Sequence, residues 1–163
     1  MPVTTPAETP YTILVDTREQ NPFEFTDIRS NDGEQLFVYQ KRATLQSGDY
    51  SIKDMENQIA IERKSHIDFL GSIGQGRDRF QREIARLNEM ECAAVVIEVG
   101  WRDLMAGHIN SQLNPTAISR TIMSWSIRYP KVHWWLAENR RHAELMTFRL
   151  LDRFWKLKEE KEI

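Results

Sequence analysis

The sequence predicts an α/β fold in which a mixed central β-sheet is flanked by helices. The run from Cys92 to Val99 is almost entirely apolar, as expected for a central strand that is covered on both faces. A helical stretch separates this run from a strand over 58–64, and such a crossover favours parallel pairing of the two strands. A hairpin that joins 49–53 to 59–64 would pair antiparallel. Both kinds of pairing are therefore expected in one sheet.

The composition is typical of one globular domain. Of the 163 residues, 40% are hydrophobic, which is enough to bury a core. The lone cysteine, Cys92, cannot form a disulfide within the chain, which favours a reducing, intracellular setting, the cytoplasm if the source is a bacterium or a phage. Residues 1–10 lack the regions of a signal peptide, and no stretch is long enough to span a membrane. We expect 1–10 to be a flexible tail and 11–163 to be a single domain.

Six strands are expected where apolar or β-branched residues run between turn residues. They are 11–16, 36–45, 48–53, 58–64, 93–99 and 132–136. A stripe at helical spacing, formed by Phe80, Ile84 and Leu87, predicts a helix over 77–90. The glycine-rich stretch 71–76 fits a loop between two helical pieces, because it lacks the spacing of a nucleotide-binding loop.

The last third of the chain is expected to add a helix, a short strand and a long helix. Asn114 and Pro115 are typical of a helix start, and Pro130 ends this helix before the strand over 132–136. In the long helix over 140–158, apolar residues cover more than one stripe. We expect one face of this helical extension to pack on the core and the surplus to contact a second copy or another protein. The tryptophans fit core packing better than stacking on unpaired bases.

Two carboxylates and a lysine in the hairpin suggest metal-assisted hydrolysis of a phosphodiester. Glu62 and Lys64 are separated by one residue, so on a strand their side chains point to the same face. The hairpin would place Asp49 beside Glu62, and two hard oxygen ligands are suited to Mg²⁺. A Mg²⁺ ion there could activate a water, while Lys64 orients that water or stabilises developing charge. Taken alone, the E-R-K run at 62–64 could also belong to a half-solvated strand that has no catalytic role.

A second strand end offers further polar groups. The apolar run 13–15 is followed by Asp16 and Arg18, which predicts a buried strand that delivers charged side chains at its end. Asp16 could add a third carboxylate and Arg18 a phosphate contact, although an ordinary polar turn has the same pattern. Arg63, in the hairpin, is suited to a bidentate contact with a phosphate or a carboxylate.

Four motifs, in this order, resemble the nuclease domain of the XPF-type structure-specific endonucleases, a family that includes the archaeal Hef nuclease. They are D-T-R-E at 16–19, G-D-Y at 48–50, E-R-K-x-x-x-D at 62–68, and Gly76-Arg77 followed by Gln81. The resemblance covers roughly residues 11–100. It implies a restriction-endonuclease-like core and a divalent-metal-dependent endodeoxyribonuclease that uses Mg²⁺, for which we expect Mn²⁺ to be able to substitute.

The resemblance also implies roles for individual residues. The metal ligands that it implies are Asp16, Asp49 and Glu62. The remaining catalytic residues that it implies are Lys64, Arg63, Arg18, Glu19 and Asp68. Many XPF-type proteins carry a tandem helix-hairpin-helix module, and we find no convincing pair of such hairpins in residues 101–163. His66 lies inside the active-site segment and is a candidate substrate contact.

Arginines of the 77–90 helix are candidates for DNA contacts. Arg79, Arg82 and Arg86 recur on a face other than the buried stripe, and such a row suits the phosphates of a nucleic acid. The alternative is that these arginines are solvated surface charges that bind no ligand. We include Arg77, from the Gly76-Arg77 motif, among the DNA-binding candidates.

Charge is unevenly distributed along the chain. Residues 1–62 carry five basic and eleven acidic side chains, whereas residues 120–158 carry nine and three. An acidic part that gathers metal and a basic part that holds phosphate would explain the net charge of −2 in a DNA-binding protein.

The sequence therefore predicts a metal-dependent DNA endonuclease. Its expected substrates are branched, flapped or single-strand-containing DNA in repair, recombination or the processing of phage or replication intermediates. A catalytically silent, nuclease-like scaffold that binds DNA with a partner is the alternative from another class. An RNA- or nucleotide-directed hydrolase is a second alternative, which substrate preference would distinguish.

Overall fold

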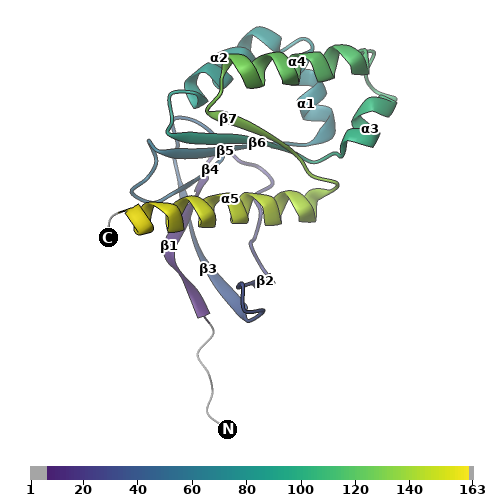
Figure 1. Ribbon diagram of the computed structural model, residues 1–163. Helices are drawn as coiled ribbons and strands as arrows, with labels where there is room; N and C mark the ends of the chain where they lie inside the picture. Colours follow the sequence, from purple (N-terminus) through teal and green to yellow (C-terminus); the bar gives the residue numbers. More distant parts are fainter. Residues whose placement is uncertain (1–6, 162–163) are drawn as a thin grey trace.

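Seven strands and five helices form the described part of the chain, residues 7–161 of a computed structural model (Figure 1). The strands are β1 (Ala7–Asp16), β2 (Ile28–Arg29), β3 (Gln35–Ala43), β4 (Tyr50–Ile52), β5 (Ile59–Lys64), β6 (Cys92–Ile97) and β7 (Val132–Leu136). The helices are α1 (His66–Ile73), α2 (Arg77–Leu87), α3 (Trp101–Ala106), α4 (Pro115–Arg128) and α5 (Arg140–Lys161). Every predicted strand and helix has a counterpart, and β2 and α3 are additional.

All seven strands belong to one mixed sheet, in the order β2-β3-β1-β4-β5-β6-β7. Pairing is antiparallel from β1 to β4 and from β4 to β5, and parallel from β5 through β6 to β7. Helices α1 to α4 cover one face of the sheet, and α5 crosses the other (Figure 1). The predicted α/β class, the hairpin and the parallel crossover are therefore confirmed.

The first strand begins earlier than the sequence suggested. Residues 7–10, which we expected in the flexible tail, are the start of β1, where Ala7 lies opposite Leu36 of β3. Pro10 cannot donate to the strand ladder, and the register shifts between Glu8 and Thr12. The proline hides the strand from pattern reasoning, so the expectation for 7–10 was wrong. Residues 1–6 lie outside the described part of the chain.

Strand β6 shows why an all-apolar run is needed at the centre of the sheet. Ala94 and Val96 face the core under α5, whereas Ala93, Val95 and Ile97 face the core under the helices of the other side. All five are at most 1% exposed. Alternation along a strand covered on both faces therefore leaves no position for a polar side chain.

The last third of the chain is an integral part of this fold and not an extension. Strand β7 pairs with β6, and α5 packs on the sheet through Phe148 and Leu151, which are fully buried. Five further apolar residues of α5 are partly buried against the same core: Leu145, Met146, Leu150, Phe154 and Trp155. The expected partner surface on 140–158 is thus largely used inside the molecule.

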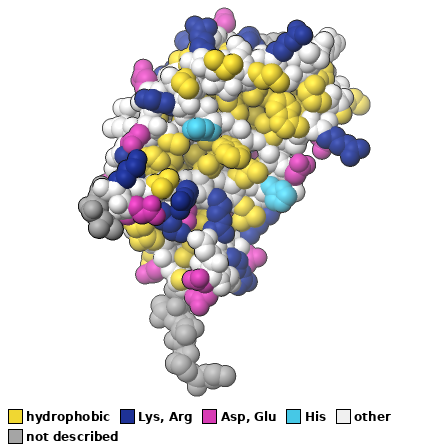
Figure 2. Space-filling model, viewed as in Figure 1, with side chains coloured by type: hydrophobic (Ala, Val, Ile, Leu, Met, Phe, Trp, Pro, Cys, Tyr) yellow, Lys and Arg dark blue, Asp and Glu magenta, His cyan; other side chains and the backbone are white. Residues whose placement is uncertain are grey.

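Exposed apolar side chains gather elsewhere. The large ones on α3, α4 and β7 are Trp101, Met105, Met123, Ile127 and Trp135. Figure 2 shows hydrophobic side chains over this part of the surface. None of the helices within residues 7–161 has both the length and the apolar character needed to cross a membrane.

Loop lengths differ slightly from expectation near the glycines. Gly71 lies within α1, so the connection to α2 comprises only residues 74–76. Ser65 begins α1 as its N-cap, and its side chain accepts a hydrogen bond from the Asp68 N–H. This cap places the start of α1 directly after Lys64, the last residue of β5.

Candidate active site

Charged side chains from several elements meet at one edge of the sheet. Strands β1 and β5 both run antiparallel to β4, which lies between them, so they end where β4 begins. Asp16 ends β1, Asp49 precedes β4, and Glu62 and Lys64 lie at the end of β5. A hollow of about 470 Å³, here called the site hollow, opens at this edge beside α1 and α2. A smaller hollow of about 210 Å³ adjoins it and shares Asp49 and Glu62 with it.

The turn before β4 places Asp49 against β5. Gly48 has a φ of +76°, in the left-handed region that glycine adopts at little steric cost. A Cβ there would lie 3.0 Å from the Cβ of Ala60 and 3.1 Å from the carbonyl oxygen of Ile61, so it would push the turn away from β5. The Asp49 N–H donates to that carbonyl at 2.8 Å. Asp49 and Glu62 consequently line the same hollow.

Asp49 and Glu62 form a carboxylate pair with little charge compensation. The Glu62 side chain is only 14% exposed, and its Oε1 lies 3.7 Å from the Nζ of Lys64. Asp49 accepts a hydrogen bond from the backbone N–H of Arg63 at 2.8 Å. Burial raises the pKa of both carboxyl groups, and the charge of Asp49 raises the pKa of Glu62 further. A positive charge placed between them would therefore be stabilised.

Lys64 is held at the wall of the site hollow. Its Nζ lies 5.0 Å from the centroid of the Phe80 ring, in a cation–π arrangement. Phe80 is itself buried, because it belongs to the apolar stripe of α2. An ammonium group has three donors, more than the one contact with Glu62 uses, so Lys64 can also bind an anion in the hollow.

Arg63 is committed to a buried network of carboxylates. Its Nε and Nη2 donate to the two oxygens of Glu19 at 3.1 and 3.2 Å, and its Nη1 donates to Glu98 at 2.6 Å. The side chains of Arg63 and Glu19 are 9% and 8% exposed. Burial opposes ionisation of Glu19, but the bonds from Arg63 outweigh it and lower the pKa of that carboxyl. Of the two partners considered for Arg63, the structure shows a carboxylate.

Asp16 is likewise satisfied within the protein. Its Oδ2 accepts a hydrogen bond from the Nε of Arg18 at 2.9 Å, and its Oδ1 accepts one from the Leu45 N–H at 2.9 Å. Burial would raise the pKa of Asp16, but these bonds outweigh it and lower the pKa. The Arg18 side chain is 69% exposed and lines both hollows. Arg18 thus anchors Asp16 and also reaches the site.

No group of three metal ligands is already assembled in the described residues. Within 7–161, three or more His, Cys, Asp or Glu side chains nowhere lie together so that they could hold a metal ion. Asp16 borders the smaller hollow with Asp49 and Glu62, but both its oxygens accept hydrogen bonds from the protein. The carboxylates of Asp49 and Glu62 fit a hard divalent cation, which would relieve their mutual repulsion. Asp16 as a third ligand stays a prediction.

Of two residues predicted for the site after the E-R-K run, Asp68 lines the site hollow and His66 does not. Asp68, in the first turn of α1, lines the site hollow. The imidazole of His66 lies edge to face with that of His108, with ring centroids 4.9 Å apart, and is not among the groups that line the site hollow. The geometry therefore places Asp68 in the site and gives no support to a substrate contact by His66.

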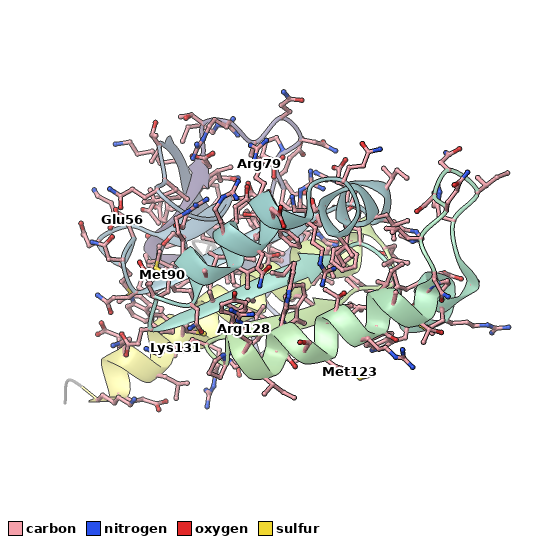
Figure 3. All side chains as sticks on the ribbon, turned by 90° about the horizontal axis from the view of Figure 1, so that it is seen from above. Glu56, Arg79, Met90, Met123, Arg128 and Lys131 are labelled. Carbon is pink, nitrogen blue, oxygen red and sulfur yellow. The ribbon has the colours of Figure 1, made fainter. Side chains whose placement is uncertain are left out.

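The four arginines of α2 do not share one face. Arg79 lines both hollows, Arg86 lines the smaller one, and Arg82 is exposed one turn before Arg86. Arg77 is engaged by α4, because its Nη1 donates to the Oγ1 of Thr121 at 3.0 Å. Figure 3 shows Arg79 on the side of α2 that faces away from α4. Only part of the predicted arginine set is therefore directed to the hollows.

Three charged residues of this region escaped the sequence analysis. Glu83 follows Arg79 by one helical turn, pairs with it at 3.6 Å and lines both hollows. Its charge also contributes to the raised pKa of Glu62. Glu98 directly follows β6, and a charged residue at the end of an apolar strand is the sequence feature that could have predicted its place in the site. Arg140, 3.6 Å from Glu98, comes from α5, and no local pattern links the two.

Known proteins share the pattern and the fold. A family model described as the ERCC4 domain matches residues 15–150. Among solved structures, XPF from Aeropyrum pernix is similar, with a TM-score of 0.64 and 19% sequence identity. The similar region covers 88% of this chain and 60% of that one, so this chain spans less than two thirds of that protein. No curated protein matches the sequence.

These comparisons extend the resemblance drawn from the motifs. The motifs covered roughly residues 11–100, whereas the family match continues through α4 and β7 into α5. The structural similarity confirms the restriction-endonuclease-like architecture, a mixed sheet flanked by helices.

Proposed function

We propose a function from the premise that this chain belongs to the ERCC4 domain family: it is a DNA endonuclease that hydrolyses phosphodiester bonds at the site hollow. One observation supports this most strongly. Asp49 and Glu62 are half-buried in the lining of the same hollow with little charge compensation, and Lys64 lies next to Glu62 there, with arginines at the border. Such a pair is costly to keep in a fold unless a cation and an anionic substrate use it.

The metal proposed for this pair is Mg²⁺, with Mn²⁺ able to substitute. Asp49 and Glu62 would hold it through carboxylate oxygens, the ligands that this ion prefers. When bound, a divalent cation supplies a Lewis acid that polarises a phosphoryl oxygen and lowers the pKa of a water. Asp16 would join as a third ligand only if one of its oxygens gave up its bond from Arg18 or Leu45.

The side chains around the pair have separate tasks in this proposal. Lys64, positioned by Phe80, donates to the scissile phosphate or to the attacking water and stabilises charge that develops there. Arg18 and Arg79, both at the rim of the hollow, bind phosphates of the DNA backbone. Arg63 also lines the hollow, but its guanidinium is bonded to Glu19 and Glu98, so its task is to hold the end of β5 in place.

The substrates proposed are branched, flapped or single-strand-containing DNA, in repair, recombination or replication processing. The test is to incubate the protein with labelled single-stranded, duplex, flap and forked DNA, each with Mg²⁺, Mn²⁺ or EDTA, beside Asp49→Asn. We expect cutting that requires the metal, ranks these substrates and is lost in Asp49→Asn. Cutting that persists in EDTA or in Asp49→Asn would contradict the assignment of the site. An RNA strand in the same panel tests the RNA-directed alternative.

A second candidate is a catalytically silent scaffold that binds DNA with a partner. The observation in its favour is that the described residues contain no assembled group of three metal ligands. Its mark would be DNA binding that is equally tight with Mg²⁺ and with EDTA, without cutting of any DNA in the panel.

Association with a partner and location also remain proposals. We propose action inside the cell, where DNA is the substrate. Self-association through 140–158 stays a prediction. Within the described part of α5, Leu157 is the one large apolar residue that is classed as exposed, at 40%. Light scattering at high protein concentration tests it, and a monomer would remove it.

A further inference from the structure

A third hollow continues from the site hollow along α1. It measures about 500 Å³ and lies between α1 and the loop over 110–113. Ile67 and Gly71 line both hollows, so the two spaces meet at the exposed face of α1. A DNA strand with a phosphate at Lys64 in the site hollow therefore has a second space adjoining it.

The linings of these two hollows differ in chemistry. The site hollow is lined largely by charged side chains, including Asp49, Glu62 and Lys64. The third hollow has no charged side chain among its lining residues, which all lie in the described chain. Its lining is apolar or neutral and polar: Ile67, Leu70, Leu113, Gln75, Asn110, Ser111 and Gln112, with two glycines. A neutral, flat group with hydrogen-bonding edges fits such a lining better than a phosphate does.

The walls of the third hollow are held by contacts within the protein. A Cβ on Gly74 would lie 3.4 Å from the Cδ1 of Leu113, so the loop packs closely on the end of α1. The loop is turned by hydrogen bonds from the Ser111 N–H to the His108 carbonyl at 3.0 Å and from the Leu113 N–H to the Ser111 Oγ at 3.2 Å. The space is therefore formed before a ligand arrives.

We propose that the third hollow takes one unpaired nucleobase of the strand whose phosphate occupies the site hollow. This inference rests on the proposed function and narrows its substrate to DNA with an unstacked base next to the cut. Aliphatic side chains such as Ile67 and Leu113 can cover the face of a base by van der Waals contact, and amide groups can meet its edges. A base paired within a duplex is stacked and cannot enter a separate hollow.

Gly71 offers a direct test, because a side chain there would project into open space. Apart from its own stretch of helix backbone, a Cβ on Gly71 meets no atom within 4 Å, so the side chain of Gly71→Leu starts into open space where the two hollows meet. Leucine also has a higher helix propensity than glycine. The matched control is Ser124→Leu, which adds a leucine at an exposed position of α4 that lines neither hollow.

The experiment compares two short labelled strands of equal length and charge, one fully abasic and one with a single base at its centre. Affinity for each is measured by fluorescence anisotropy in EDTA. In the wild-type chain we expect the base to tighten binding about tenfold. Gly71→Leu should lose this gain, Gly71→Ala should lose part of it, and Ser124→Leu should keep it. Because the gain is a ratio, a general loss of affinity cancels.

Two outcomes would overturn the inference: no gain from the base in the wild-type chain, or an undiminished gain in Gly71→Leu. Cutting of flap DNA with Mg²⁺ is followed in parallel with the wild-type chain. Cutting without a gain from the base leaves the nuclease standing and removes the base hollow. A gain from the base without cutting would support the base hollow and contradict the nuclease activity. The failure of one proposal can therefore be distinguished from the failure of the other.

Discussion

Two groups of charged side chains occupy the same edge of the sheet, and the fold treats them differently. Arg63 bonds to Glu19 and Glu98 at 2.6 to 3.2 Å in a largely buried network, and Arg140, 3.6 Å from Glu98, supplies the second positive charge. Asp49 and Glu62 are half-buried beside them, and within residues 7–161 the ion-pair partner of Glu62 is Lys64, at 3.7 Å. The pKa of Glu19 is lowered by its partners, whereas burial raises those of Asp49 and Glu62.

This difference separates support from chemistry within one short motif. On β5, Glu62, Arg63 and Lys64 all line the site hollow, but the Arg63 guanidinium is bonded to Glu19 and Glu98. Hydrogen-bond partners, and not access to the hollow, thus give these neighbouring residues different tasks. A neutralised network stabilises the fold, while an uncompensated pair is tolerable only if a ligand compensates it.

The largest effect should come from neutralising the uncompensated pair. Glu62→Gln keeps the shape but removes a carboxylate proposed to hold the metal, so cleavage should fall roughly 10⁴-fold. Stability should stay the same or rise, because the repulsion from Asp49 disappears. Cleavage assays with Mg²⁺ and urea unfolding measure the two quantities. Wild-type cleavage, or a clear loss of stability, would place Glu62 with the supporting network instead.

The next effect tests the neutralised network. Arg63→Met leaves Glu19 and Glu98 buried without their main partner, so the free energy of unfolding should fall by about 3–5 kcal/mol. Urea unfolding measures this change, and Arg102→Met, at an exposed position of α3, is the control. If Arg63→Met unfolds like the wild type but no longer cuts, Arg63 belongs to the chemistry and the comparison fails.

Lys64→Met should have a smaller effect on cleavage than Glu62→Gln. Removing one donor that stabilises developing charge typically costs about 10²–10³-fold in rate. Methionine keeps the apolar contact with Phe80, so thermal unfolding should change little. The measurement is the cleavage rate at saturating DNA and Mg²⁺. A rate equal to that of the wild type would show that Lys64 only offsets the charge of Glu62.

The smallest effect contrasts two arginines of α2. Arg79→Ala should weaken DNA binding and reduce the salt dependence of binding by about one phosphate contact. Arg77→Ala should leave that salt dependence unchanged and lower stability by about 1 kcal/mol, because it loses the bond to Thr121 and the cation–π contact with Trp125. Binding titrations over a range of salt separate them. A reduced salt dependence in Arg77→Ala alone would reverse this assignment.

Much of the fold could be predicted from periodicity. The apolar run of β6, the apolar start of β5 and the stripe of Phe80, Ile84 and Leu87 are local patterns, so they indicate their elements directly. The start of β1 was missed because Pro10 interrupts the strand pattern, and β2 was missed because two residues carry no period. Spacing along α5 could not show which of its apolar residues meet the core, because other segments complete that core.

The sequence by itself determined the order of the motifs, the hairpin, the crossover and which side chains could do chemistry at the strand ends. Only the tertiary structure decided which charges neutralise one another. Arg63 bonds to Glu98, Asp16 to Leu45, and Arg77 to Thr121 of α4, and each of these contacts joins segments that are far apart in the chain. The bond from Arg18 to Asp16 joins near neighbours, but it depends on the turn that follows β1. The local pattern determines the position of a residue on its strand or helix. Burial and ionic partners determine the charge state of its side chain, and they depend on the complete fold.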